Sequence, residues 1–347
     1  MQQKSNSVWG MAGAYIAFVI GSGFASGQEI VQFYAAFGRG GLGAIAISAV
    51  LLSWVGGSLM AAGCQMRQCL PTRPYRLFCG KPLGIVFEWL TSIYLFCTLV
   101  VMYSGAGAAL QEYYALPHLW GSLFMAVLVF VTYAGGFRRL TDIVGRIGPI
   151  IIAFTLAVSV GTLWRTGIHI EENIQAAKAA PNWWSSGILY AAYNVFGAIP
   201  FLMALGSGAA SRKKAAAGGI VGGLSLMGTV LCMDLALLSG GDMHYTVPTL
   251  QLAHELAGWM GVLYSLILLC GIYSTAAPML WTVCGNMARQ GDGKWPAALL
   301  SAVALALAQL PFDRLVALIY PCTGYMGLLL LVCLAVWQLR KNKERQP

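Results

Sequence analysis

One interruption in a long apolar stretch constrains this chain more than any other feature. Residues 8–37 are apolar enough for one membrane helix, but the segment 21–27 in its middle reads Gly-Ser-Gly-Phe-Ala-Ser-Gly. Each glycine inside a helix costs about 1 kcal/mol relative to alanine. In lipid, an opened backbone is tolerated only where it is buried in protein or lines a cavity. The pattern predicts a first helix that is broken near the membrane centre, where main-chain groups are free to bind a ligand.

The composition indicates a membrane protein. Of the 347 residues, 58% are hydrophobic and 10% are charged, which is far less charge than a soluble protein carries. A span needs about 20 apolar residues to cross the hydrocarbon. On this basis the sequence predicts an all-α protein with ten spans, at about 8–37, 41–66, 83–110, 119–135, 147–165, 186–206, 217–238, 258–287, 296–310 and 314–339.

The basic residues mark one side of the membrane. If the N-terminus is cytoplasmic, all but four of the 21 Lys and Arg residues fall in cytoplasmic segments, the exceptions being Arg39, Arg165, Lys178 and Arg314. Short cytoplasmic loops carry an excess of Lys and Arg, so both termini are predicted to be cytoplasmic. The formal net charge of +9 is then a property of topology and does not indicate a nucleic-acid partner.

A second interruption is predicted in the sixth span, where Gly197 and Pro200 favour a break or kink. Five spans precede it, and it enters the membrane from the side opposite to the first span. The sequence therefore predicts a single transmembrane domain over 1–347, built from two inverted five-span repeats at about 8–165 and 186–339. Interrupted segments at corresponding positions of two halves indicate the central site of a transporter.

The residues around the first break resemble a known family. The run Gly-Ser-Gly-Phe-Ala-Ser-Gly-Gln-Glu-Ile over 21–30, followed by Gln32, Phe33 and Gly38, is similar to the YkvI family of membrane transporters. Its first residues also resemble the GSG-type signature of the amino acid–polyamine–organocation superfamily. The resemblance implies a LeuT-type fold, with helices 1 and 6 unwound around a substrate site, in a plasma membrane (in bacteria, the inner membrane). It does not identify a substrate.

The first break supplies candidate substrate-binding groups. Beyond it, residues 27–37 are predicted to restart as a half-helix whose free N–H groups and positive dipole end favour an anion. The main chain of Gly21, Ser22, Gly23 and Phe24 is therefore a candidate for binding a substrate carboxylate. Alternatively, the glycines only allow close packing of helices, as small residues do in membranes.

The sixth span offers a possible wall for the same site. Tyr193, Asn194 and Phe196 lie beside its predicted break, and an aromatic surface with an amide suits a small amphipathic solute. Tyr94 and Tyr103 in the third span are further candidates. Aromatic residues in apolar spans also serve packing alone, so both interpretations stay open.

Glu29 is a carboxylate inside the first span, and such groups are functional candidates in membranes. It is a candidate for taking up a proton or for facing a cationic substrate. Ser26 and Glu29 also match the S-x-x-E capping box with Ser26 as N-cap, so Glu29 alternatively stabilises the helix restart. Glu88 and Asp234 lie within about two turns of predicted span ends, and we expect their side chains to reach the interface.

The resemblance also implies a sodium site. In the eighth span, Ser274 and Thr275 follow Gly271 by about one turn and resemble the helix-8 part of the sodium site in LeuT-type transporters. The matching carbonyls are those of Ala17 and Ile20 before the first break, with Gly271 as the third. Neutral oxygens of this kind suit a hard cation. Alternatively, both hydroxyls bond back to carbonyls of their own helix.

Together these features predict a secondary transporter of a small organic solute, an amino acid or related amine, coupled to sodium by alternating access. Two alternatives remain: proton coupling through Glu29, and a transporter-like sensor that binds its ligand without moving it. We expect no enzyme, because the histidines fall outside the predicted spans and no catalytic cluster is predicted within them. The expected partners are the substrate, membrane lipid and sodium, with no other cofactor, no nucleic acid and no nucleotide.

Overall fold

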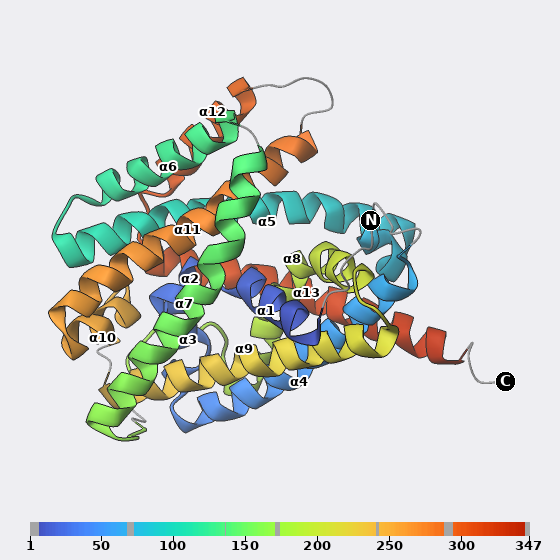
Figure 1. The fold of residues 1–347 in the computed structure, drawn as a ribbon, viewed down its shortest axis with the longest axis horizontal. Helices are drawn as coiled ribbons and strands as arrows, with labels where there is room; N and C mark the ends of the chain where they lie inside the picture. The colour runs from blue at the N-terminus through green and yellow to red at the C-terminus, as the bar shows by residue number, and fades with distance from the viewer. Residues whose placement is uncertain are drawn as a thin grey trace.

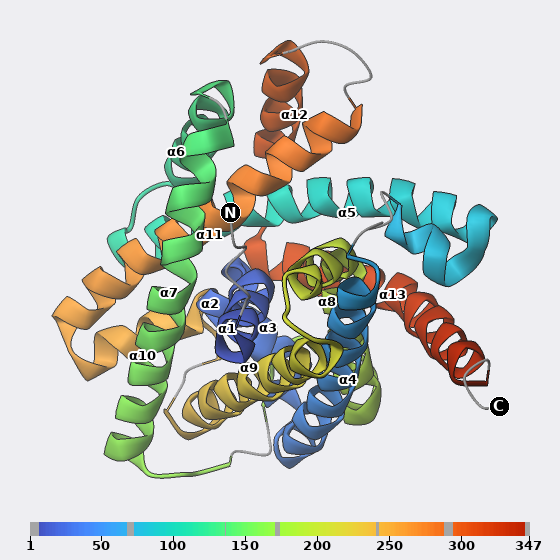
Figure 2. The same ribbon diagram turned by 45° about the vertical axis from the view of Figure 1, so that its right-hand side comes forward.

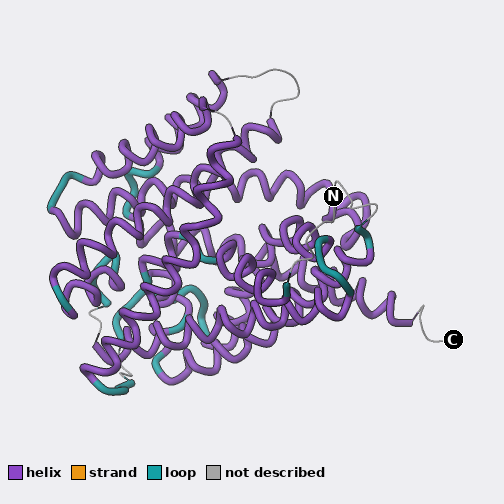
Figure 3. Tube along the Cα trace, viewed as in Figure 1, coloured by secondary structure: helices purple, strands orange, loops and turns teal. Residues whose placement is uncertain are grey.

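The computed structural model describes residues 7–67, 73–135, 137–170, 174–240, 243–287 and 294–343. Within these ranges every regular element is a helix (Figure 3). In chain order they are α1 (Val8–Val19), α2 (Ser22–Ser26), α3 (Gln28–Phe33), the 3-10 turn η1 (Ala35–Phe37), α4 (Arg39–Gln65), α5 (Pro74–Tyr114), α6 (His118–Gly135), α7 (Phe137–Thr166), α8 (Trp183–Ser207), α9 (Arg212–Gly240), α10 (Pro248–Leu256), α11 (Gly258–Met287), α12 (Lys294–Leu307) and α13 (Phe312–Lys343). The all-α prediction is confirmed for the described residues.

Several of these helices have the length and composition of membrane spans. Among the described residues, seven qualify: α4, α5, α6, α8, α9, most of α11 and most of α13. Three shorter apolar helices, Val8–Val19, Ile150–Thr166 and Lys294–Leu307, occupy the places of the first, fifth and ninth predicted spans. The chain is therefore a multi-pass membrane protein, and the count of ten spans stays a prediction.

The long axis of the molecule joins two ends of different chemistry. At one end α4 and α8 finish side by side, since the guanidinium of Arg67 donates to the carbonyl of Ala209 at 3.0 Å. The basic first residues of α9 and the last turns of α13 lie at the same end, which is on the right in Figure 1. We call it the basic end. The opposite end carries α10, and we call it the α10 end.

Small residues let the central helices approach closely. A Cβ on Gly219 of α9 would overlap the backbone of Gly56 in α4. Likewise, a Cβ on Gly63 of α4 would overlap the backbone of α8, and one on Gly206 of α8 would overlap α4. Such backbone contacts are typical of membrane helix packing. The short helices α1, α2 and α3 lie in the middle of the bundle in both views (Figures 1 and 2).

The sixth predicted span is one continuous helix, α8, so the prediction that helix 6 is unwound was wrong. Pro200 has no N–H to donate to the carbonyl of Phe196, four residues earlier. The hydroxyl of Tyr75, at the start of α5, donates to this carbonyl instead at 2.8 Å. Because the missing helix bond is replaced from a neighbouring helix, α8 continues through Gly197 and Pro200 without opening.

We expect Tyr75→Phe to lower the stability of the protein, because it leaves the Phe196 carbonyl without a donor inside the bundle. A buried polar group left unsatisfied costs about 1–3 kcal/mol. Thermal unfolding of the purified protein in detergent measures the loss. Tyr325→Phe removes the same atom from a side chain that is 54% exposed, and should unfold like wild type. Equal unfolding midpoints for the two variants would contradict the role given to Tyr75.

Candidate functional site

The first predicted span is interrupted, which confirms the prediction made from the segment 21–27. Helix α1 ends at Val19, Ile20 and Gly21 are extended, and the chain turns again in α2. Gly27, at φ 86°, then takes the left-handed conformation that favours glycine and directs the chain into α3. The half-helix predicted over 27–37 is therefore divided into one short helix, α3, and the 3-10 turn η1.

A cavity of about 1370 Å³ reaches this break from the basic end. Its walls come from α1, α5, α7, α8, α11 and α13. Near its mouth, Arg76 donates two hydrogen bonds of 2.9 and 3.0 Å to Glu88, and Arg73 lies 3.8 Å from the same carboxylate. At its inner end lie Gly21 and Glu29. The broken helix is thus accessible from one end of the molecule.

The other side of the break is closed. Three side chains surround Gly27: Thr249 and Pro248 from α10, and Met233 from α9. Two residues before Gly27, in α2, the carbonyl of Ala25 accepts a hydrogen bond of 2.5 Å from the hydroxyl of Tyr264 in α11. Among the described residues these contacts close the break toward the α10 end, whereas the cavity reaches it from the basic end.

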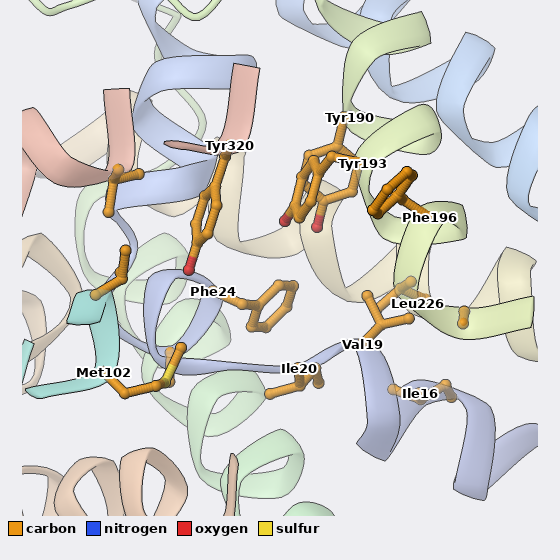
Figure 4. Packing of buried hydrophobic residues seen from close by; sticks show 14 of the residues in the cluster. Ile16, Val19, Ile20, Phe24, Met102, Tyr190, Tyr193, Phe196, Leu226 and Tyr320 are labelled. Atoms are coloured by element: carbon orange, nitrogen blue, oxygen red, sulfur yellow. The ribbon is translucent and has the colours of Figure 1, made fainter. Parts of the chain in front are cut away.

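Glu29 is the ionisable side chain at the inner end of the cavity. It is 3% exposed. The hydroxyl of Tyr193 donates a hydrogen bond to its carboxylate, and the Tyr320 hydroxyl and the main-chain N–H of Phe24 lie near enough to interact with it. Figure 4 shows Tyr193 and Tyr320 approaching from α8 and α13, with their hydroxyls directed toward the coil that carries Phe24. Such donors compensate the burial of a carboxylate, which is otherwise very unfavourable.

Aromatic rings form part of the wall around this carboxylate. The rings of Tyr193 and Tyr320 are stacked, with centroids 5.0 Å apart and an interplanar angle of 1°. Tyr94 and Asn194 also line the cavity, although the Asn194 amide donates to a carbonyl of its own helix at 2.9 Å. Phe196 is fully buried behind Tyr94, with ring centroids 5.6 Å apart, and does not line the cavity.

Glu29 does not complete the predicted capping box. The N-cap of α3 is Gly27, so Ser26 lies one residue too early to hold that position. The Ser26 hydroxyl donates to the carbonyl of Gly23 at 2.9 Å and accepts from the N–H of Gln28 at 3.3 Å. The carboxylate of Glu29 extends over Gly23 instead, where a Cβ would overlap it. The capping interpretation was therefore wrong.

The main-chain groups predicted to bind a substrate carboxylate are partly occupied. The N–H of Phe24 interacts with Glu29, and Gly23 lies against the same side chain. Gly21 lines the cavity. Ser22 begins α2, and its side chain lies outside the described part of the structure. The protein places its own carboxylate over these amides, so the inner end of the cavity favours a positively charged group.

Four of the five predicted sodium ligands line the same cavity: Ala17, Ile20, Ser274 and Thr275. The hydroxyls of Ser274 and Thr275 donate to the carbonyl of Gly271 at 2.8 and 3.2 Å, as in the alternative interpretation of this pair. A hydroxyl that donates keeps lone pairs that can accept or ligate. The residues therefore fit a sodium ion, and sodium binding stays a prediction.

Tyr320 is a site residue that the sequence analysis did not predict. A single tyrosine in an apolar span resembles a packing residue, and the following Pro321, which weakens helix bonding, was the one local signal. Tyr103, named as a candidate, bonds to Ser301 at 2.9 Å and does not line the cavity. The spacing of tyrosines along one span does not show which of them meets a carboxylate on another.

The fold is that of LeuT-type transporters. The chain superposes on an inward-facing conformation of Mhp1 with a TM-score of 0.59 and 13% identity, over 94% of this chain and 74% of Mhp1. It also superposes on a manganese transporter of Eremococcus coleocola with a TM-score of 0.60 and 12% identity, over 96% of this chain and 85% of the transporter. At these identities the similarity establishes the fold alone.

Sequence comparison identifies homologues in Bacillus subtilis (strain 168). The chain is homologous to the uncharacterized membrane protein YkvI, with 25% identity over 334 residues that cover 94% of this chain and 95% of YkvI. The uncharacterized protein YyaD is also 25% identical, over 330 residues that cover 92% of this chain and 94% of YyaD. No protein-family model matches the chain. The resemblance to YkvI seen at the first break therefore extends over almost the whole chain.

We expect Gly23→Leu to abolish ligand binding, because a side chain at this position would displace Glu29 from Tyr193. Ligand-induced shifts of the unfolding temperature, screened with amino acids and amines, measure binding. Gly13→Leu, on α1, is the matched control, since a Cβ there meets open space. A Gly23→Leu variant with the ligand shift of wild type would place the binding site elsewhere.

Proposed function

We propose that this protein is a secondary active transporter of a small organic amine, either an amino acid or a related amine, coupled to sodium by alternating access. The observation that carries the proposal is the buried carboxylate of Glu29 at the inner end of the cavity, beside the break in the first helix. Broken helices around a midplane site are typical of secondary transporters. The LeuT-type fold agrees with transport and offers no support for an enzyme.

The proposal includes a membrane arrangement. Ten spans, with the first break between α1 and α2, form two inverted five-span repeats within one domain. The basic end faces the cytoplasm, together with both termini, because Lys and Arg are retained on that side. The cavity then opens toward the cytoplasm, and the protein lies in the plasma membrane, as expected for a multi-pass protein with bacterial homologues.

The inner end of the cavity supports an amine as the substrate. An ammonium group would pair with the Glu29 carboxylate in a medium where charged interactions are strong. The stacked rings of Tyr193 and Tyr320 lie beside that carboxylate, and aromatic faces attract cations. The carboxylate of an amino acid would have to find donors other than the N–H of Phe24, which already faces the Glu29 carboxylate.

Two coupling ions remain candidates, and a specific observation supports each. Sodium is supported by the position of Ala17, Ile20, Ser274 and Thr275 around the same cavity. A proton carried by Glu29 is supported by the burial of this carboxyl group, since burial disfavours an unpaired charge. In the second scheme the substrate and the proton compete for one carboxylate.

Uptake into proteoliposomes tests the proposal. We would compare amino acids with their decarboxylated amines, under an inward sodium gradient, an inward proton gradient, or neither. Accumulation of an amine that requires a sodium gradient is the expected result. Accumulation that follows only the proton gradient would replace sodium by Glu29 as the coupling element. Binding of a ligand without accumulation under any gradient would contradict transport and indicate a sensor.

We expect Glu29→Gln to weaken amine binding by about 10- to 100-fold, because hydrogen bonds to charged groups contribute about 1.5–3 kcal/mol. Titration calorimetry with the amine found in the uptake screen measures the affinity. Glu88→Gln is the control, because Glu88 lies at the cavity mouth and pairs with Arg76. An unchanged affinity in Glu29→Gln would show that the substrate does not bind this carboxylate.

We expect Thr275→Ala to raise the sodium concentration for half-maximal uptake by about tenfold, which corresponds to about 1.4 kcal/mol. Thr282→Ala is the matched control, since its hydroxyl also bonds back to α11 but lies about two turns farther along the helix. If both variants keep the sodium dependence of wild type, Thr275 does not ligate the ion.

A further inference from the structure

A second buried carboxyl group lies outside the cavity, on α9. Asp234 is 0% exposed, and neither of its carboxyl oxygens has a hydrogen-bond partner. The sequence analysis expected this side chain to reach the membrane interface, and that expectation was wrong, because α9 is covered at this depth by other helices. Unlike Glu29, Asp234 does not line the cavity. An intramembrane carboxyl group of this kind requires a functional explanation.

Asp234 lies in the half of the bundle nearer to the α10 end. It is six residues from Gly240, the last residue of α9, which corresponds to about 9 Å along a helix. The preceding residue, Met233, contacts Gly27, where α9 and α10 meet the broken first helix. Gln28, the next residue after Gly27, also has a buried side-chain oxygen without a partner. Two buried side chains with oxygens that lack partners, Asp234 and Gln28, therefore lie on segments that meet at the closed side of the break.

Among the described residues, no ion pair involves Asp234. The segments that pack around α9 carry titratable or charged groups, which include Tyr15, Glu29, Tyr34, Arg39, Arg165, Tyr190, Tyr193, His254 and Glu255. Tyr34 is within electrostatic reach of Asp234, but its hydroxyl donates to Ser48 at 2.8 Å. Arg165 donates to the carbonyl of Glu255.

We propose that Asp234 is a proton-binding site, separate from the substrate cavity, which holds its proton while the α10 end is closed. A buried carboxylate without hydrogen-bond donors or a counter-ion is very unfavourable in this environment, whereas the neutral acid is tolerated. When the α10 end opens, water reaches Asp234, its O–H bond breaks, and the proton passes to the external water, leaving a hydrated carboxylate.

This inference rests on the proposed alternating access and adds an external pH dependence to it. Because closing the α10 end requires a protonated Asp234, low external pH favours the closed α10 end and high external pH favours the open one. Asp234→Asn mimics the neutral acid permanently. The variant should therefore favour the closed α10 end at every pH, whatever the substrate or coupling ion.

Infrared spectroscopy of the full chain in lipid tests proton binding without any transport. At neutral pH we expect wild type to show the C=O stretch of a protonated carboxylic acid, which Asp234→Asn lacks and Asp234→Glu restores. Glu29→Gln is the control and should keep the band of Asp234. Identical carboxylic-acid bands in wild type and Asp234→Asn would overturn the proposal.

Labelling of a cysteine with a membrane-impermeant thiol reagent tests the conformational part. In a variant without the native cysteines, Thr249→Cys reports opening of the α10 end, because Thr249 is fully buried there. We expect external labelling, expressed relative to that of an exposed cysteine at the same pH, to increase as external pH rises and to lose this dependence when Asp234→Asn is added. The ratio removes the rise in thiolate that every cysteine shows. Glu255→Cys, exposed on the same helix, should label equally in all backgrounds. A pH dependence that survives Asp234→Asn would overturn the proposal even if transport is confirmed.

Discussion

The satisfaction of main-chain polar groups inside the membrane is the constraint on which this structure depends. Lipid supplies no hydrogen bonds, so a helix opened at mid-depth must find donors and acceptors within the protein. Here the N–H of Phe24 interacts with Glu29, and the carbonyl of Ala25 accepts from Tyr264. Side chains from other helices thus hold the broken segment open. These main-chain groups of the broken segment also account for the carboxylate and the aromatic rings that lie at the inner end of the cavity.

The contrast between the first and sixth spans shows how local this constraint is. Both contain residues that weaken a helix, and the sequence predicted a break in both. In α8, however, a single hydroxyl from Tyr75 replaces the bond that Pro200 removes, and the helix stays closed. The segment 21–27 contains three glycines, and no single donor compensates for all of them. A sequence shows where a helix is weak, but not which distant side chain repairs it.

Local properties of the sequence predicted one part of the site, and contacts between distant segments determine the other part. The spans and the first break follow from apolar length and glycine content, which are local properties, and Glu29 follows from the rarity of acids in membrane helices. The partners of Glu29 come from α8 and α13, far away in the chain, so spacing could not select Tyr320. The capping box failed for a conformational reason, because the left-handed Gly27 shifts the helix start by one residue.

Two buried carboxyl groups lie in opposite surroundings, one toward each end of the molecule. Glu29 has a donor in Tyr193 and faces a cavity that is open toward the basic end, whereas Asp234 has no donor and is sealed near the α10 end. In a transporter that opens its ends in turn, the group that water reaches alternates between them. A charge on Asp234 is compatible only with the conformation that hydrates it, so its protonation state and the closed α10 end are linked thermodynamically. That linkage needs no contact between Asp234 and the substrate, because both act on the same conformational equilibrium.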